Sequence, residues 1–540
     1  MATATTMTRP VRTTFLIIAL LLAVGLQPLA ALPASAEPVP PLPEEPEAAA
    51  QVAAGWLALQ LVDDERIEGE FGADVGLTAD VAFALAAAGV AETQLLASID
   101  WLSTQAPGYT QGVPFDQDDA VYAGATAKLI LALLLDDRDV RDVAGIDLLA
   151  QLEDREQADG RFTDTSEFGD FSSTLSQSLA ILALERAEDV RPSASAVGFL
   201  LDQQCEDGGF RFEAVDPDDP DAAECTSSVD TTGFAVQALL EVDEGDATEA
   251  ARDAAAWLVE VQDTSGAYGS DDGLNANSTA LATLALELAP AVTGGDAAQA
   301  AALAYLLSLR TGCEGAFPGA IPFSAEDTGD VARATSQVIP GLVGAGLATV
   351  AADGASTEVP ALLPFTDVTA GSAHAPAICE LFARGAVRGF DERTFGPQRG
   401  LTRAQAASVL AELLGLAPVA GEPFTDVAAG SRHAGAIAAL EDAGIVTGRS
   451  DGTFGPGETL RRDQAASLLA RALELAPADG PGFDDVAEDN AHAGSIAALA
   501  AVGIVTGTTS TTFSPAVDVR RDQFASLLQR GFPAEEEATS

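Results

Sequence analysis

Residues 203–210 of the 540-residue chain read Gln-Gln-Cys-Glu-Asp-Gly-Gly-Phe, and Asp-Thr-Thr-Gly at 230–233 opens the next apolar stretch. The first segment ends a helical pattern and turns at two glycines before an aromatic residue. The second segment begins a helical pattern rich in small residues. The same order of helix, glycine–aromatic turn and small-residue helix recurs six times between residues 48 and 350. Six such pairs predict an (α/α)6 toroid, because closely packed inner helices need small side chains.

Six first helices alternate with six second helices in this prediction. The first helices open at Trp56, Trp101, Leu148, Phe199, Trp257 and Tyr305, and the second helices cover 78–89, 124–135, 175–187, 231–242, 277–288 and 333–346. The pattern resembles the prenyltransferase and squalene-cyclase repeat class. That resemblance implies the ring fold but leaves function open, because the ring hosts cyclases, protein prenyltransferases, corrinoid carriers and thioester proteins.

One acidic motif in the ring is a candidate for catalysis. Squalene-hopene-type cyclases protonate an alkene with the middle acid of an Asp-x-Asp-Asp motif, and residues 116–119 read Asp-Gln-Asp-Asp. The resemblance would make Asp118 the acid, flanked by Asp116 and Asp119. The alternative is that these acids only cap a helix, since 82 acidic residues make chance matches common. The toroid has no histidine, so we expect no zinc site and no Ser-His-Asp site in it, and we predict no metal or cofactor.

The C-terminal part of the chain repeats at an interval of 59 residues. The three histidines of the protein lie at this interval, at His374, His433 and His492. The same interval relates Phe365, Phe424 and Phe483, then Phe395, Phe454 and Phe513. Each unit predicts a helix after the histidine, a glycine–phenylalanine–proline turn and a second helix. Because one unit alone buries little apolar surface, we expect the three to pack into one body.

The repeat carries the residues of a known module. The middle unit has Phe-Thr-Asp-Val at 424–427, Gly-Ile-Val-Thr-Gly at 444–448 and Asp-Gly-Thr-Phe-Gly-Pro at 451–456. These residues resemble the surface-layer homology (SLH) domain. The resemblance implies a three-lobed helical module that non-covalently holds a secondary cell-wall polysaccharide with acidic, often pyruvylated, sugars.

The SLH signature predicts the glycan contacts. The family's Thr-Arg-Ala-Glu motif stands here as Thr-Arg-Ala-Gln at 402–405 and as Arg-Arg-Asp-Gln at 461–464 and 520–523, so each unit keeps its arginine and replaces glutamate with glutamine. A planar guanidinium at a helix start suits a carboxylate ligand. The alternative is that the arginines pair within the module with the repeated aspartates. The glycan-binding candidates are Arg403, Arg462, Arg521, Asp367, Asp426 and Asp485. The histidines are interpreted as packing or capping residues.

The excess of acidic residues limits the classes of molecule that the protein can bind. The chain has 82 acidic and 27 basic residues, a net charge of −55 and a single lysine, Lys128. Such a field repels phosphate backbones and anionic lipids, so binding to nucleic acid or to a membrane surface is excluded. The lack of lysine fits life in high salt, and it fits a GC-rich coding sequence equally well.

The N-terminal segment and two linkers define the predicted domain boundaries. Residues 1–36 read as an export signal, with Arg9, Arg12, an apolar run at 15–26 and a small-residue cleavage site; an uncleaved signal anchor is the alternative. The predicted units are the signal, a Pro/Glu linker at 37–47, the toroid at 48–350, a linker at 351–363, and SLH units at 364–422, 423–481 and 482–535. A disulfide is predicted between Cys205 and Cys225, which flank a 19-residue acidic loop, whereas Cys313 and Cys379 are assigned no partner.

These features together predict a function. We expect an exported bacterial cell-surface protein, without a membrane span after signal cleavage, that is held on wall polysaccharide by its SLH units. The toroid would bind an unidentified ligand or partner. The alternative is an extracytoplasmic enzyme of the terpenoid-cyclase type that uses Asp118.

Overall fold

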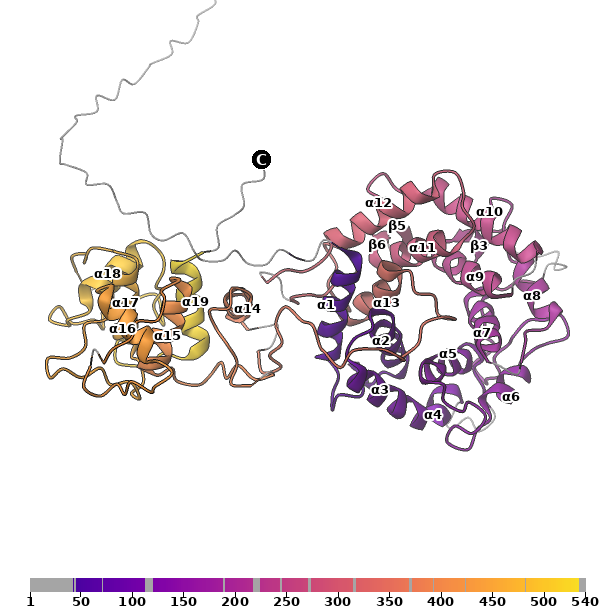
Figure 1. The fold of residues 1–540 in the computed structure, drawn as a ribbon. Coiled ribbons are helices and arrows are strands. Elements are labelled where there is room, and N and C mark those ends of the chain that lie inside the picture. The colour runs from indigo at the N-terminus through magenta and orange to yellow at the C-terminus, as the bar shows by residue number, and fades with distance from the viewer. Residues whose placement is uncertain are drawn as a thin grey trace, which may run out of the picture.

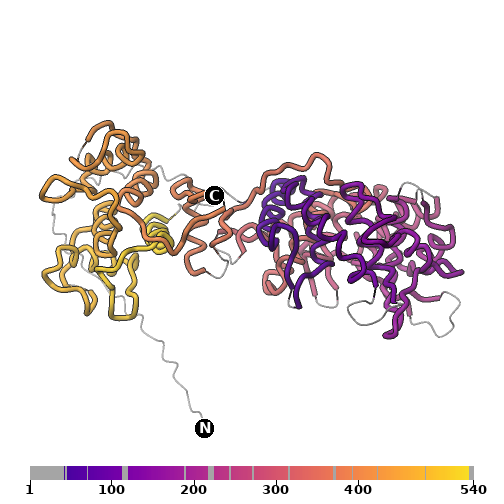
Figure 2. Tube along the Cα trace, turned by 90° about the horizontal axis from the view of Figure 1, so that it is seen from below, coloured from indigo at the N-terminus to yellow at the C-terminus, as the bar shows by residue number. Residues whose placement is uncertain are grey.

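A computed structural model shows a ring of helices followed by a smaller helical module (Figures 1 and 2). It describes residues 42, 45–69, 71–111, 120–187, 190–216, 224–242, 245–270, 273–313, 317–368, 372–391, 393–422, 424–480 and 482–533. The predicted export signal and most of the linker at 37–47 lie outside these residues.

Six inner helices form the wall of the ring. Each contacts the next, and the last returns to contact the first, which closes the ring (Figure 1). The inner helices are α2 (Val75–Ala88), α5 (Ala123–Leu133), α7 (Thr174–Arg186), α9 (Val229–Val242), α11 (Ala276–Leu288) and α13 (Val331–Val343). The outer layer holds α1 (Pro46–Ala58), α3 (Glu92–Thr104), α4 (Ala106–Thr110), α6 (Leu148–Glu153), α8 (Ala194–Leu201), α10 (Gly245–Val261) and α12 (Gly295–Ser308). The predicted (α/α)6 toroid is confirmed.

Crowding between inner helices explains their small residues. A Cβ added at Gly341 on α13 would lie 2.5 Å from the carbonyl oxygen of Ala280 on α11. A Cβ added at Gly233 on α9 would lie 2.9 Å from the Cβ of Leu281. Real side-chain atoms do not approach so closely, so glycine at these positions sets the spacing of α9, α11 and α13.

A repeated hydrogen bond ties five of the six glycine–aromatic turns to the inner helix that follows; the second turn lies outside the described residues. The backbone N–H of Phe210 donates to Thr232 Oγ1 at 2.9 Å, and the N–H of Tyr268 donates to Thr279 Oγ1 at 2.9 Å. The same bond joins Ile67 to Thr78, Phe162 to Gln177 and Ile321 to Thr335. A buried polar side chain is thus satisfied by the turn, which explains why a threonine, or once a glutamine, recurs near the start of these inner helices.

Three short antiparallel hairpins precede inner helices. Strands β1 (Glu68–Gly69) and β2 (Gly72–Ala73) come before α2, and β5 (Tyr268–Ser270) and β6 (Gly273–Asn275) come before α11. Strands β3 (Phe210–Arg211) and β4 (Ser227–Ser228) come before α9. They place the residues that follow them at the end of the ring where the inner helices start.

The C-terminal module is cyclic. Its helices are α14 (Ala375–Ala383), α15 (Arg403–Leu413), α16 (Ala434–Asp442), α17 (Arg462–Ala472), α18 (Ala493–Ala501) and α19 (Arg521–Gly531). The second helix of each unit packs on the first helix of the next, as α15 on α16 and α17 on α18, and α19 returns to α14. One apolar cluster runs through all three units, so the three-lobed module is a single body.

The predicted linker at 351–363 is a packed strap. The N–H of Ala352 donates to the carbonyl of Leu135, and the N–H of Ser356 donates to the carbonyl of Gly89, both on the toroid. A disulfide also joins Cys313 of the toroid to Cys379 on α14. These cysteines had no predicted partner, because 66 residues separate them and only the folded strap brings them together. The toroid and the module are therefore covalently joined beside the strap.

Candidate functional site

Each SLH unit uses its aspartate to hold its own turn. Asp426 accepts the N–H groups of Phe454 and Gly455, both at 2.7 Å. Asp367 and Asp485 accept the equivalent pairs of N–H groups in their units. Burial would raise the pKa of Asp426, but these hydrogen bonds outweigh it and hold that pKa below its ordinary value; the same holds for Asp485. Both oxygens of each aspartate are thus engaged by backbone.

The three signature arginines connect neighbouring units. Arg403 Nε donates to the carbonyl of Phe454 at 2.8 Å, and its guanidinium lies 4.7 Å from the centre of that ring. Arg462 makes the same contacts with Phe513 of the third unit. Among the described residues, none of the three arginines forms an ion pair with the repeated aspartates. The arginines therefore stabilise the module in a different way, because each side chain contacts the backbone and the aromatic ring of a neighbouring unit.

The glutamine that replaces glutamate keeps a structural function. Gln405 Oε1 accepts the N–H of Thr402, while Thr402 Oγ1 accepts the N–H of Gln405. At the start of α17 and α19 the glutamine half of this exchange is kept: the backbone N–H groups of Arg461 and Arg520 donate to Oε1 of Gln464 and Gln523, both at 3.3 Å. The other half has no counterpart there, because a guanidinium cannot accept a hydrogen bond. An amide can accept this bond without adding a charge, so the helix start is preserved.

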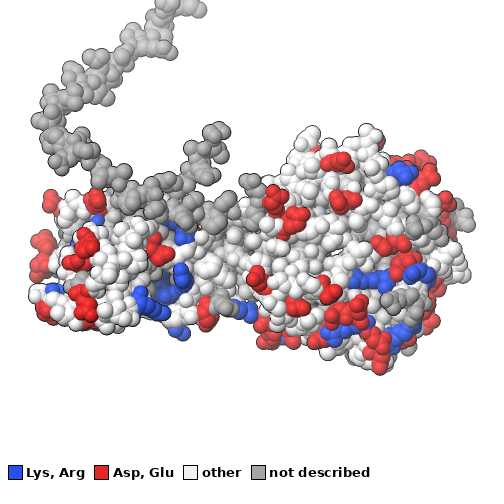
Figure 3. All heavy atoms as spheres, viewed as in Figure 1, with Lys and Arg blue, Asp and Glu red and all other residues white. Residues whose placement is uncertain are grey.

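A groove with three arginines lies between the first two SLH units. It has a volume of about 230 Å³, and Arg403, Arg449 and Arg471 line it together with His492. Arg449 pairs with Glu458, and Arg471 donates to the carbonyl of Ile445 at 3.1 Å. In a chain with a net charge of −55, such a concentration of guanidinium groups is a local exception. Figure 3 shows basic side chains gathered on one part of the module, while acidic ones are spread widely.

The positions equivalent to Arg449 and Arg471 differ in charge between the three units. Positions 59 residues from Arg449 hold Phe390 and Thr508, and positions 59 residues from Arg471 hold Glu412 and Arg530. The boundary between the second and third units therefore keeps two arginines of this set, Arg462 and Arg530. The boundary between the third and first units has Arg521 and Glu412, and Arg399 stands there at the position of Glu458. Sequence reasoning missed Arg449 and Arg471, although the 59-residue register exposes them as positions where the units differ.

The toroid encloses a second site, a cavity of about 390 Å³. Apolar side chains make up much of its wall, among them Phe83, Leu175, Leu179, Phe234, Leu281 and Leu284. Polar side chains from five inner helices lie on the same wall, namely Asp80, Lys128, Asp230, Gln237, Asn277, Ser278, Ser336 and Gln337. A volume of this size, with few polar groups on an apolar wall, is typical of sites for small molecules.

The polar groups of the cavity form a chain of contacts. Lys128 Nζ lies 2.5 Å from Asp80 Oδ1, and Gln337 Nε2 donates to Asp80 Oδ2 at 3.2 Å. Asn277 Nδ2 in turn donates to Gln337 Oε1. Burial lowers the pKa of Lys128, but the Asp80 carboxylate outweighs that effect and the pKa is raised overall. The only lysine of the protein is therefore held as a cation inside the ring.

Asp230, in the first turn of α9, faces the same cavity. Burial raises the pKa of Asp230, and a hydrogen bond with Ser278 opposes that rise. Among the residues that the structure describes, its Oδ1 is buried and has no hydrogen-bond partner, and the same is true of Asn277 Oδ1. Two acceptor atoms on the cavity wall are thus left unsatisfied by the protein, which is costly unless water or a ligand in the cavity supplies donors.

The acid motif lies outside the described residues. Asp116, Asp118 and Asp119 fall in the undescribed segment 112–119, so catalysis by Asp118 stays a prediction. Within the part of the chain that the structure covers, no group of three or more His, Cys, Asp or Glu side chains is placed to hold a metal ion. No described helix is long and apolar enough to cross a membrane.

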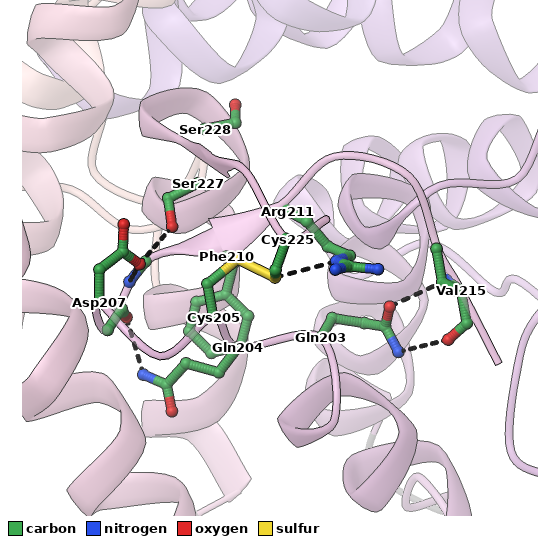
Figure 4. The surroundings of a disulfide bond; sticks show 12 residues. Gln203, Gln204, Cys205, Asp207, Phe210, Arg211, Val215, Cys225, Ser227 and Ser228 are labelled. Carbon is green, nitrogen blue, oxygen red and sulfur yellow. Dashed lines mark hydrogen bonds between the residues drawn. A yellow bond between two sulfur atoms is a disulfide. The ribbon is translucent and has the colours of Figure 1, made fainter. Parts of the chain in front are cut away.

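The structure joins Cys205 to Cys225, the pair that the sequence favours (Figure 4). Arg211 Nε lies 3.0 Å from Cys225 Sγ, and Gln203 brackets Val215 with one bond to its N–H and one to its carbonyl. The disulfide therefore joins the segment before β3 to the segment before β4. Strand β4 leads directly into α9, the helix that carries Asp230.

Comparisons with known proteins agree with the C-terminal module. The family model of the S-layer homology domain matches residues 364–407, 423–466 and 482–525. The S-layer protein EA1 of Bacillus anthracis is 34% identical over 139 residues, which are 25% of this chain and 16% of that protein. Cell surface glycoprotein 1 of Acetivibrio thermocellus is 31% identical over 163 residues, 27% of this chain and 7% of that protein. The chain thus spans less than a fifth of the length of either relative.

Solved structures were also compared with the chain. The type II terpene cyclase MstE from Scytonema superposes with a TM-score of 0.42 at 15% identity, over 55% of this chain and 98% of that one. This likeness concerns the ring of helices, and no function is taken from it. The 59-residue repeat, the cyclic packing and the family match lead to one conclusion: the chain carries three S-layer homology domains behind a helical toroid and is a secreted cell-surface protein.

Proposed function

We propose that the SLH module anchors this protein to an acidic cell-wall polysaccharide, so that the toroid is displayed at the surface as a ligand-binding ring. The observation that carries the proposal is the groove of Arg403, Arg449 and Arg471 in a strongly acidic chain. Carboxylate and pyruvyl groups would accept bonds from the guanidinium groups, which suit planar anions.

Of these three arginines, Arg449 is the one best placed to contact the polymer. Arg403 and Arg471 each donate to backbone carbonyls, which fixes their positions, whereas the partly exposed Arg449 forms an ion pair with Glu458. A polymer anion could therefore replace Glu458 as the partner of Arg449 without disturbing the packing of the units. The aspartates Asp367, Asp426 and Asp485 would act by shaping the turns that form the groove.

Binding of the full chain to cell walls from the source organism tests the proposal. We expect binding to walls that keep their polysaccharide and none to walls stripped of it by hydrofluoric acid. Arg449→Glu should weaken binding by about tenfold, because a charge-assisted contact is replaced by a repulsive one. Arg252→Glu, on outer helix α10, makes the same charge change away from the groove and should have little effect. Equal binding to stripped walls would overturn the proposal.

The enzyme alternative is tested separately. If the toroid is a terpenoid-cyclase-type enzyme, Asp118→Asn should abolish a product that cells expressing the chain otherwise make. An unchanged product profile would remove that alternative.

A further inference from the structure

We infer that the toroid cavity binds an amphipathic primary amine, with the ammonium group between Asp230 and Asn277 and the apolar body along the ring wall. The inference rests on the proposed ligand-binding role of the ring and names the chemical class of the ligand. It follows from which polar atoms of the cavity are already bonded and which are free.

The Lys128–Asp80 ion pair determines which group donates and which group accepts in each of the hydrogen bonds that follow it along the cavity wall. A carboxylate paired with a lysine accepts hydrogen bonds, so Gln337 must turn its Nε2 toward Asp80. Gln337 Oε1 then faces α11, and Asn277 must turn its Nδ2 toward it. Asn277 Oδ1 is left without a partner, as an acceptor and not as a donor. The amide orientations are thus set by the charge pair.

Asp230 supplies the second free acceptor. Its Oδ1 is buried and unpartnered, while its carboxyl group is also hydrogen-bonded with Ser278, the neighbour of Asn277. Both free atoms on this part of the wall are therefore acceptors, and a ligand that satisfies them must bring two hydrogen-bond donors. A hydroxyl group brings one donor, whereas a primary ammonium brings three.

Charge also favours an ammonium group. Lys128 neutralises Asp80, so an ionised Asp230 leaves a net charge of −1 on the part of the cavity wall that the structure describes. Near this end of the ring, Arg333 is shared by two further acids, Asp74 and Asp330. A cation inside the cavity would balance Asp230 and would oppose the effect of burial on its ionisation. An anionic head group would meet an unpaired carboxylate instead.

The apolar wall selects the rest of the ligand. Phe83, Leu179, Phe234 and Leu284 line the cavity beside the polar groups, and they come from α2, α7, α9 and α11. A hydrocarbon body would bury these surfaces and gain hydrophobic free energy in proportion to the area covered. A small polar amine lacks that gain, so the ligand must have both parts.

Calorimetric titration of the full chain tests the inference with three probes of equal chain length. We expect n-octylammonium to bind about tenfold or more tightly than n-octanol, and sodium octanoate to bind weakest. This comparison needs no variant, so it stays decisive even if a cavity substitution impairs folding. Asp230→Asn should reduce octylammonium affinity by about tenfold and leave octanol affinity unchanged. Asp246→Asn, an exposed site on α10, removes the same charge and should change neither.

Two results would overturn the inference in different ways. If octanol and octylammonium bind equally, and Asp230→Asn has no effect, the ring binds apolar ligands without selecting an ammonium group. If none of the three probes binds, the ligand-binding role proposed for the ring fails as well. Wall binding by the SLH module is measured independently and is untouched by either result.

Discussion

Arg521 in the third SLH unit donates its Nε–H to the carbonyl of Phe395 in the first unit at 2.9 Å, across 126 residues of sequence. Its guanidinium also lies 4.4 Å from the ring centre of Phe395 and donates to the carbonyl of Arg388. Arg403 and Arg462 make the matching contacts at the other two boundaries. The three arginines thus complete a cycle, and Arg521 makes the contact that closes it.

Arg521→Met should open this cycle. Loss of two hydrogen bonds from a charged donor and of a cation–π contact should lower the free energy of unfolding of the module by about 2–3 kcal/mol. Urea unfolding of the full chain, followed by circular dichroism, measures the change. Arg388→Met is the control, because the side chain of Arg388 is exposed and only its carbonyl takes part. Equal stability of both variants would contradict the closing role.

Glu412→Arg should strengthen wall binding. Glu412 occupies the position that Arg471 and Arg530 hold in the other units, so the substitution would replace an acid by a cation at the boundary between the third and first units. If the unit boundaries bind an anionic polymer, affinity for native walls should rise several-fold, and the rise should shrink in high salt as charges are screened. Sedimentation with purified walls at two salt concentrations measures both effects. Unchanged or weaker binding would argue against an electrostatic role for that boundary.

Lys128→Met should destabilise the toroid. The substitution leaves the Asp80 carboxylate in the cavity wall without its cation, which costs about 3 kcal/mol when a largely buried pair is broken. All three tryptophans of the chain lie in the toroid, so their fluorescence reports its unfolding in urea. The double variant Lys128→Met/Asp80→Asn should recover part of the loss. A double variant less stable than the single one would show that the lysine does not act through Asp80.

Acidification should weaken the SLH module first through its histidines. Burial lowers the pKa of His374, His433 and His492, and each Nδ1 lies within hydrogen-bonding distance of a serine hydroxyl. The unfolded chain then binds protons more readily, so stability is full above about pH 6.5 and falls as pH drops below that value. The lowered pKa values of Asp426 and Asp485 act in the same direction at lower pH.

Histidine NMR checks this directly, since all three histidines belong to the module. In the folded full chain, labelled with ¹³C-histidine, the three signals should titrate at lower pH than the signals of the same chain in urea. A folded-state midpoint at or above the urea value would reverse the sign of the prediction.

Removing Cys205–Cys225 should cost about 3 kcal/mol. The bridge closes a loop of 20 residues, and the entropy of the unfolded chain rises when it is absent. Replacement of both cysteines by alanine, with tryptophan fluorescence in urea as the readout, tests this. The pair Ser227→Ala and Ser228→Ala leaves the bridge in place and serves as the comparison. A loss no larger than in that comparison would mean that the loop is already ordered without the bridge.

The fold could be predicted from the sequence because both halves repeat. The recurring glycine–aromatic turns mark where one helix of each of the six pairs ends and the next begins. The 59-residue interval marks the three units of the module. The contacts of Arg403 could not be foreseen in the same way, because its partner Phe454 lies in the next unit and only cyclic packing brings it near. The free acceptor atoms of Asp230 and Asn277 could not be predicted either, because the sequence does not show which polar atoms remain without a hydrogen bond after folding.

The strap and the Cys313–Cys379 disulfide determine how the ring can be separated from the SLH module. A protease that cuts within residues 351–363 severs the peptide between ring and module, yet the bridge from Cys313 to Cys379 spans the cut. The ring would stay attached until the disulfide is reduced. Shedding therefore takes two unrelated chemical events, one hydrolytic and one reductive, and neither alone releases the ring to the medium.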